Sequence, residues 1–492
     1  MSINWLSQNH YEKAMELSKE SGKPILIYFH SETCLGCQNI KSNILVEQAT
    51  LKKVESRTIP VWVEVESDKP DPMISRLVGS HIFIMSPTVQ LIDHNGDIYH
   101  KFLGAPLHTR LSLGYTKVHH DIFGDLDQHK FNQQLEIGLA KWDMFRKDYG
   151  KAVEQFDNIM DANNEQSLAY REAAYWQPIA SNEGGYPEDE TQVSVNGLSP
   201  LAKEVKLFCD TLKDVPDSDL MIDWKGDAVK GWEHYTDCLR EFVFGVYQCL
   251  IDFSIEVKGN RARDGQQLTA VQEVLREWQV AFRALQGVMA GLKGADVDAQ
   301  HLDENYSLGK QRTIRNNYVH CVMAEFWAHA TSIRNTLHGI RNGEESSLKN
   351  KKPILDTVEK YGLPPENFGD INALIDISES THKQLMEEFS NITDEELDSG
   401  YAWWENNEIT IRFRLNRMGW HIYDHIAVIE TICERIGRVR SECERLVALL
   451  YTALGKAESE LVGLNDEQQQ LLSTKIVEVM KDRRMKLEKI YK

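Results

Sequence analysis

The sequence has no long hydrophobic run. No stretch of its 492 residues approaches the roughly 18 consecutive apolar residues that a membrane-spanning helix needs. The opening residues, Met1-Ser2-Ile3-Asn4-Trp5, also lack the basic and apolar regions of a secretory signal. These two absences predict a protein that neither enters a membrane nor is secreted, and we expect it in the cytoplasm.

Basic residues are outnumbered. The chain has 55 Lys and Arg against 75 Asp and Glu, which gives a formal net charge of -20. The phosphate backbone of nucleic acid repels such a chain, so a general affinity for nucleic acid is not expected. The excess negative charge favours solubility instead.

Cysteine is scarce. Six of the eight cysteines are scattered singly, at positions 209, 238, 249, 321, 433 and 443. This pattern does not resemble the disulfide framework of a small secreted protein, which again favours the cytoplasm. Only Cys34 and Cys37 form a close pair, so their surroundings decide what the pair means.

The residues around this pair alternate between strand and helix patterns. The apolar run at 24–29 is typical of a buried parallel strand, and it ends just before Cys34. Asn95-Gly96 between two apolar runs predicts a hairpin. Helices are expected at 9–21, 36–54 and 107–122 with a helical turn at 73–78, and strands at 24–29, 59–65, 88–92 and 98–102. After the first helix, the predicted order is βαβαββα.

Beyond residue 130 strand patterns become hard to find. Residues 149–176 have the spacing of a helix-turn-helix unit that is similar to a single tetratricopeptide pair, and residues 181–200 have the Gly, Pro, Ser and Asn content of a linker. Helical patterns then occupy 200–214, 227–257, 265–293, 311–341, 367–391, 408–438 and 439–488. The predicted fold class is multidomain, an α/β domain followed by an all-α region.

The position of the cysteine pair predicts thiol chemistry. A cysteine at the first turn of a helix faces unpaired backbone N–H groups and the positive end of the helix dipole, and both stabilise a thiolate. Cys34 is therefore the expected nucleophile. Cys37 lies one helical turn later and would resolve the mixed disulfide that Cys34 forms.

This layout, with Ser86-Pro87-Thr88 ahead of the later strands, resembles the thioredoxin-like family over about residues 1–122. The resemblance implies that Pro87 is a cis proline packed against the dithiol and shares the site with Cys34 and Cys37.

The pattern departs from true thioredoxins at several positions. Thr33 replaces Trp, Leu35-Gly36 replaces Gly-Pro, and Tyr28 stands where a buried Asp would assist proton transfer. Glu32 adds a negative charge that works against a thiolate. One alternative is a docking domain with two incidental thiols. A structural zinc site is disfavoured because the chain has no second CxxC.

A second candidate site is marked by histidines on the predicted helix at 408–438. Its apolar stripe consists of Ile411, Leu415, Met418, Ile422, Ile429 and Ile436. At about 100° per residue, His425 falls within this stripe and His421 on its flank. Two imidazoles that lie one turn apart and face a core can bind one metal ion.

A third ligand would have to come from another segment. The predicted helix at 311–341 offers His320, His329 and His338. Helical geometry does not choose among them, because His329 lies at least as near as His320 to the apolar stripe of that helix.

A resemblance does distinguish them. The segment 313–320 with the following 324–327 looks like the second helix of DinB/YfiT-like four-helix bundles, and the segment 417–425 looks like their final core helix. The resemblance implies a metal site made by His320, His421 and His425. His329 and His338 would then be solvent-facing or partly buried. The alternative is three core histidines in an ordinary bundle.

The patterns divide the chain into five predicted parts. These are a thioredoxin-like domain at 1–125, a helical segment with the tetratricopeptide-like unit at 126–185, a linker and helical segment at 186–260, a DinB/YfiT-like four-helix bundle at 261–440, and C-terminal helices at 441–492.

Three neutral imidazoles leave at least one position on a metal ion open to water or a thiolate, and they suit Zn, Ni, Fe or Mn. The family resemblance implies a metal-dependent transferase that uses mycothiol, bacillithiol or glutathione. Asp424 and Glu325 are candidates to orient the histidines, although a solvated salt bridge is the simpler role for Asp424.

The leading hypothesis is a cytoplasmic thiol-redox enzyme that combines a CxxC exchange domain with a three-histidine metal site, and that acts as a metal-dependent transferase of a low-molecular-weight thiol. Its expected partners are a small thiol or a disulfide-containing protein, and a homodimer through the helical regions is a further prediction. One alternative is a non-catalytic stress or assembly protein that binds partners through both modules. Another is a plain disulfide reductase with an inert helical appendage.

Overall fold

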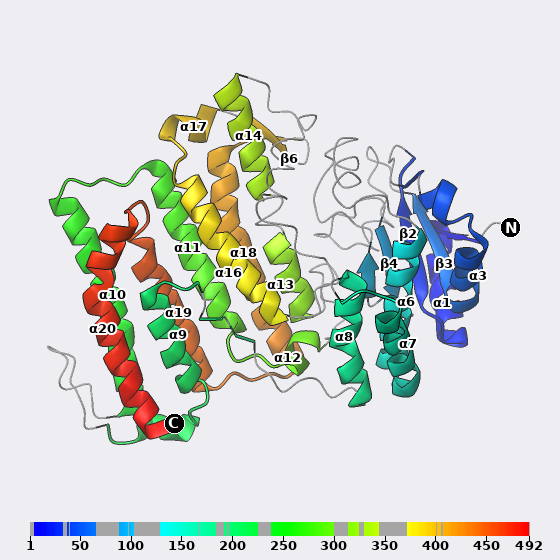
Figure 1. Cartoon of the computed structure of the whole chain (residues 1–492), viewed down its shortest axis with the longest axis horizontal. Helices are drawn as coiled ribbons and strands as arrows, with labels where there is room; N and C mark the ends of the chain where they lie inside the picture. Colours follow the sequence, from blue (N-terminus) through cyan, green and yellow to red (C-terminus); the bar gives the residue numbers. More distant parts are fainter. Residues whose placement is uncertain are drawn as a thin grey trace. The chain divides into compact units, whose positions relative to one another are not determined.

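The fold is taken from a computed structural model of the chain (Figure 1). It describes residues 4–32, 37–38, 40–64, 88–96, 98–102, 128–165, 167–183, 191–192, 194–195, 197–224, 238–299, 313–323, 329–343, 371–399, 401–404 and 407–491. The chain forms two compact units. The first consists of Met1–Glu188, Asp298–Leu374 and Tyr401–Ile409, and the second of Asp189–Val297, Ile375–Gly400 and Thr410–Lys492.

The first unit contains a mixed five-stranded sheet with the strand order β1-β3-β2-β4-β5. Strand β2 pairs in parallel with β3 and antiparallel with β4, and β4 pairs antiparallel with β5. Because β2 is central, all six of its residues are buried. The strand bounds are Leu6–Ser7 (β1), Ile25–His30 (β2), Ile59–Glu64 (β3), Thr88–Ile92 (β4) and Ile98–Phe102 (β5).

The hairpin between β4 and β5 confirms the prediction from Asn95-Gly96. Gly96 has a φ of 87°, in the left-handed region that favours glycine. The backbone N–H of Asn95 donates to the Asp93 carboxylate at 2.8 Å, which closes the turn. Strand β1 was not predicted, because two residues are too few to show an alternating pattern.

Helices cover both faces of the sheet. On one face Tyr11 and Ala14 of α1 (Tyr11–Ser21) pack against the apolar side chains of β2 and β3. On the other face α3 (Gln48–Arg57) and α6 (Gln128–Phe145) contribute Leu51 and Leu135 to a core with Leu26. The predicted α/β class of the N-terminal part is therefore confirmed.

The predicted single helix at 36–54 is interrupted in the structure. A π-helical turn, Ile40–Ile44, ends before α3 begins at Gln48. Glu47 has an extended backbone, and its carboxylate accepts from the N–H of Thr50 at 3.0 Å, so it caps a new helix. The predicted turn at 73–78 and helix at 107–122 lie outside the described residues.

Gly138 lets α6 approach the sheet closely. A Cβ at this position would overlap the side chains of Leu91 and His100. Replacing Gly138 with leucine is expected to lower the free energy of unfolding by about 1–3 kcal/mol through overpacking. Urea titration followed by circular dichroism measures this. Gly150→Leu is the matched control, because nothing lies within 4 Å of that position. An equal loss in both variants would contradict the close approach.

Two further helices continue the first unit after α6. Helices α7 (Tyr149–Asp161) and α8 (Leu168–Ser181) pack against each other and against α6, so the predicted helix-turn-helix pair is present. The later segments of this unit are α13 (Ile314–Met323), α14 (Ala330–Asn342) and a hairpin of β6 (Tyr401–Trp404) with β7 (Asn407–Thr410). Sequence patterns did not reveal this hairpin.

The second unit is helical throughout its described residues. Helix α11 packs along α18 and α19, and α19 also packs against α9 and α10 (Figure 1). The bounds are Pro200–Leu212 (α9), Leu239–Arg263 (α10), Ala270–Met289 (α11), Gly294–Asp298 (α12), Ile371–Phe389 (α16), Asp394–Ser399 (α17), Ile411–Arg435 (α18), Glu442–Ser459 (α19) and Asp466–Tyr491 (α20), with a short 3-10 helix at Asp217–Met221. The predicted all-α class of this region is confirmed, whereas the five domain boundaries stay predictions.

Two helices of this unit differ from the predicted segments in a way that local chemistry explains. Thr269 and Gln272 form a capping box, so α11 begins at Ala270 rather than at 265. The pattern at 439–488 is two helices, and Gly463 between them has a φ of 81°. A glycine in that conformation ends one helix and lets the chain reverse.

A buried ion-pair network joins three helices of the second unit. Arg283 of α11 lies 2.6 Å from a Glu379 oxygen of α16 and 2.6 Å from a Glu458 oxygen of α19. Burial opposes the charge of Arg283, but the two carboxylates outweigh it and hold the pKa of the guanidinium above its ordinary value. The charges therefore stay paired inside the bundle.

Candidate functional sites

The dithiol segment is described only in part. Cys34 and Pro87 lie outside the described residues, so the predicted thiolate and cis proline stay predictions. Cys37 is buried, and its backbone carbonyl accepts a hydrogen bond from the Tyr28 hydroxyl at 3.2 Å. Tyr28 therefore anchors the backbone at Cys37.

Helix α18 carries the histidine pair for a clear local reason. Thr410 caps it by accepting from the N–H of Phe413 at 3.2 Å. The predicted apolar stripe from Ile411 to Ile429 is buried, which turns this face of the helix inward. His421 and His425 are 7% and 8% exposed, so both imidazoles lie on the buried side.

The two imidazoles face each other. Their Nε2 atoms are 3.1 Å apart, and their rings meet edge to face with centroids 4.3 Å apart. One hydrogen at most fits between two nitrogens at this distance, so at least one Nε2 presents its lone pair. A shared proton or a shared cation satisfies such a pair.

Helix α13, which carries His320, is held by an ion pair at its start. Arg315 binds the Asp298 carboxylate through two contacts of 2.5 Å and 2.8 Å, and both side chains are buried. The Tyr175 hydroxyl of α8 donates to the same carboxylate at 3.0 Å. The resemblance to bundle proteins had drawn attention to this segment for its histidine, whereas the role of its arginine appears only in the structure.

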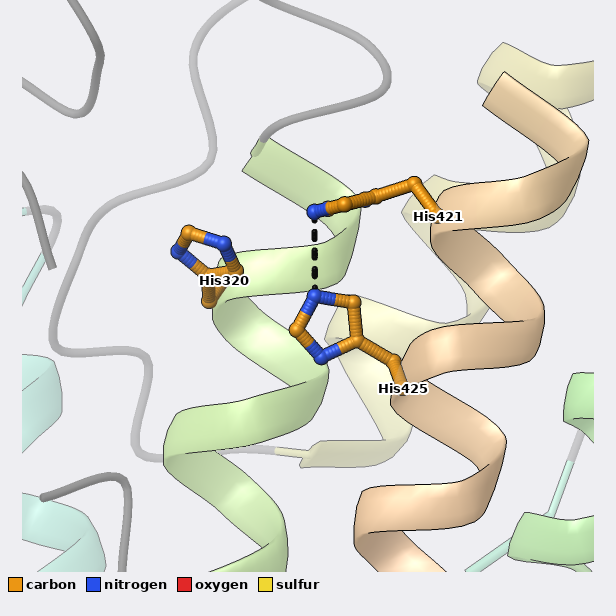
Figure 2. A group of neighbouring side chains, drawn as sticks. All are labelled: His320, His421 and His425. Atoms are coloured by element: carbon orange, nitrogen blue, oxygen red, sulfur yellow. Dashed lines mark hydrogen bonds between the residues drawn. The ribbon is translucent and has the colours of Figure 1, made fainter. Parts of the chain in front are cut away.

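His320 is half-buried on α13 of the first unit, and the α18 pair belongs to the second unit, so an ion shared by all three residues stays a prediction. Figure 2 shows the α18 rings of His421 and His425 joined by their hydrogen bond. Two nitrogens at about 2.1 Å from one ion are about 3.4 Å apart at the tetrahedral angle and about 4.2 Å apart when opposite. The 3.1 Å separation of the two α18 nitrogens is close to that of two ligands that share a cation.

The other candidate residues have different surroundings. His338 has Asn342 as a hydrogen-bond partner at 3.2 Å, and His329 is buried rather than solvent-facing or partly buried as predicted. Asp424 forms a solvated ion pair with Arg417 at 2.8 Å, the simpler of its two predicted roles. Glu325 lies outside the described residues.

Four of the scattered cysteines are poor nucleophiles. Burial raises the pKa of Cys209, Cys249 and Cys433, and it raises that of Cys443 to about 12. These residues and Cys238 carry free thiols. Thiol chemistry at neutral pH is therefore not expected from the four with raised pKa values.

Sequence reasoning missed a third group of residues. His30, Glu32 and Glu64 converge where β2 and β3 end, and His30 is the direct partner of Glu64 across the two strands. A usable signal was present, since the carboxyl ends of parallel neighbouring strands lie at one edge of a sheet and both strands end there in an ionisable residue.

Comparison with known proteins supports the N-terminal part of this account. Residues 4–93 match a family model described as thioredoxin-like. Together with the mixed sheet and its helices, the match defines an N-terminal thioredoxin-like domain. The searches of the curated proteins and of the solved structures each returned no match.

The membrane prediction can be tested only for the described helices. Within these ranges no helix has both the length and the apolar character needed to cross a bilayer.

Proposed function

We propose that this protein is a thiol-handling enzyme with two chemical centres. In the thioredoxin-like domain, Cys34 and Cys37 exchange disulfides. In the helical region, His320, His421 and His425 bind a divalent Zn, Ni, Fe or Mn ion at which a low-molecular-weight thiol is held and transferred. The observation that carries the metal part is the pair of buried imidazoles whose Nε2 atoms are 3.1 Å apart.

The exchange reaction follows from the cysteine pair. The Cys34 thiolate attacks one sulfur of a substrate disulfide, the substrate S–S bond breaks, and a thiolate leaves while a mixed disulfide forms. The Cys37 thiolate then attacks the Cys34 sulfur, which releases the second substrate thiol and leaves a Cys34–Cys37 disulfide. Two equivalents of a small thiol reduce this disulfide and are themselves oxidised to a disulfide. The match of residues 4–93 to the thioredoxin-like family supports this role.

The histidine residues support the second centre through their chemistry. Three imidazoles are ligands that borderline divalent metals accept, and none of them adds a charge that a thiolate would have to overcome. A bound divalent ion would stabilise the thiolate of a small thiol near neutral pH. The protein's own part is to hold the two α18 rings on the buried side of the helix and out of water.

The proposed location follows from the same chemistry. Free buried thiols at Cys209, Cys433 and Cys443 are compatible with a reducing compartment, and low-molecular-weight thiols are abundant there. We therefore propose that the protein works in the cytoplasm on a small thiol or a disulfide-containing protein.

Metal analysis of the full chain tests the second centre. Each protein is loaded with Zn²⁺ and dialysed. The His421→Ala and His425→Ala variants are each expected to retain one equivalent of zinc fewer than the wild type, because two ligands cannot hold the ion as three do. His94→Ala, in the exposed β4–β5 turn, is the control and should retain all bound metal. If the zinc content is the same in all four proteins, the metal centre is ruled out.

The same measurement distinguishes the main alternative. A non-catalytic assembly protein that uses both modules for partner binding has no need of stoichiometric metal. A protein that binds no metal at the three histidines but still binds partner proteins would support this alternative.

A further inference from the structure

A second group of possible metal ligands lies in the thioredoxin-like domain. It consists of one histidine and two glutamates rather than three histidines. His30 ends β2, Glu64 ends β3, and Glu32 follows two residues after His30. A ring nitrogen of His30 and one oxygen from each carboxylate lie within 4.8 Å of one another. All three residues belong to the first unit.

His30 is the buried member of the group. Its side chain is 0% exposed, and its Nδ1 lies 3.4 Å from the Tyr28 hydroxyl. That hydroxyl has a shorter contact, 3.2 Å, with the Cys37 carbonyl, which can only accept. With its single hydrogen directed there, the hydroxyl is left to accept from Nδ1–H. The Nε2 lone pair then faces the carboxylates and has no hydrogen-bond partner of its own.

A lone pair directed at two carboxylates is repulsive unless a cation lies between them. A proton on Nε2 would draw one carboxylate to about 2.7–2.9 Å, the usual length of a charged hydrogen bond. The observed separations are longer, 3.4 Å from Nε2 to Glu32 and 4.0 Å to Glu64. Two ligands bound about 2.1 Å from one ion lie about 3.4 Å apart at the tetrahedral angle and about 4.2 Å apart when opposite. Both separations from His30 fall within this range.

We propose that His30, Glu32 and Glu64 bind a divalent cation at the carboxyl ends of β2 and β3. One imidazole and two carboxylates suit Zn²⁺, Mn²⁺ or Fe²⁺ better than Ca²⁺ or Mg²⁺, which prefer oxygen ligands throughout. Two negative charges against one divalent ion leave the site close to neutral. Because Glu32 stands two residues before Cys34 in the sequence, the ion would also restrain the segment that leads into the dithiol.

Glu64 is already held in position to act as a ligand. The Trp62 indole N–H donates to one of its oxygens at 3.2 Å, and the backbone N–H of Glu32 donates to the other at 3.2 Å. The Trp62 ring also packs on the His30 ring, with centroids 4.5 Å apart. Such supporting contacts fix the orientation of ligands before the ion arrives.

Lys41 is the group that competes with a bound cation. Its ammonium lies 3.0 Å from Glu32, and this hydrogen bond is the largest cause that lowers the pKa of the Glu32 carboxyl. Both side chains are well exposed, 49% and 67%, so the ion pair is a weak surface one. A divalent ion bound by three ligands would displace it. Removing the ammonium should therefore strengthen metal binding, a result that a purely structural ion pair would not give.

The test uses the full-length His421→Ala/His425→Ala chain, in which the other proposed metal site is disabled. Equilibrium dialysis against Mn²⁺ or Zn²⁺ with elemental analysis is expected to give one bound equivalent. Glu64→Gln and Glu32→Gln should each weaken binding at least tenfold, and Lys41→Met should strengthen it by up to about fivefold. Glu20→Gln, an exposed carboxylate on α1, is the matched control.

The outcome is independent of the histidine centre. Loss of binding in the glutamine variants with retained binding in Glu20→Gln supports the site even if the three histidines bind nothing. Binding that survives both Glu64→Gln and Glu32→Gln overturns it, as does the absence of any bound equivalent in a chain with native circular dichroism.

Discussion

Replacing Cys34 with serine is expected to reduce disulfide exchange to the uncatalysed background. A serine hydroxyl is not ionised at neutral pH and cannot form the mixed disulfide, so the first bond of the reaction is never made. Reduction of insulin disulfides by a small thiol, followed with the full chain, measures the effect. A serine variant that keeps the wild-type rate would mean that the thioredoxin-like domain serves for docking alone.

Replacing Cys37 instead should separate the two cysteines by role. Without the second thiol, the mixed disulfide on Cys34 is not released by the chain, so intact mass spectrometry should find the substrate attached. Cys443→Ser is the control, since burial raises the pKa of that thiol to about 12 and leaves it unreactive. If the Cys37→Ser variant accumulates no mixed disulfide with the substrate, Cys37 is not the resolving cysteine.

Replacing Arg283 with methionine is expected to lower the free energy of unfolding of the second unit by about 3–5 kcal/mol. The arginine makes ion pairs with Glu379 and Glu458, which are 10% and 11% exposed. Without it, two buried carboxylates face each other with no compensating charge. Guanidinium titration followed by circular dichroism gives the difference as a shift of the midpoint.

Two controls show whether the charges or the packing cause the loss. Arg412→Met breaks an exposed ion pair with Asp398 and should cost only about 0–1 kcal/mol. Adding Glu379→Gln and Glu458→Gln to Arg283→Met removes the unpaired charges and should recover much of the stability. Equal losses in the single and triple variants would mean that packing, and not the unpaired carboxylates, accounts for the effect.

Local patterns predicted a large part of this molecule. The apolar run ending at His30 became a buried strand, Asn95-Gly96 became a hairpin, and the stripe from Ile411 to Ile429 became the inward face of α18. Each of these depends on residues a few positions apart, and the periods of strand and helix are visible at that distance. Fold class was readable for the same reason.

Other features were decided by residues that are distant in the sequence. The pairing of His30 with Glu64 depends on the register of β2 against β3, and the network of Arg283 depends on carboxylates 96 and 175 residues further along the chain. Helical periodicity likewise could not choose among His320, His329 and His338 as the third ligand. His320 is half-buried on α13, and its role as a ligand stays a prediction.

The sequence by itself determined which segments become strands and helices and which of their faces turn inward, because burial selects apolar residues at a local period. Only the tertiary structure decided which polar groups meet inside, because a buried charge or imidazole is stabilised by whichever partner packing brings within hydrogen-bond reach. Local sequence patterns cannot identify that partner.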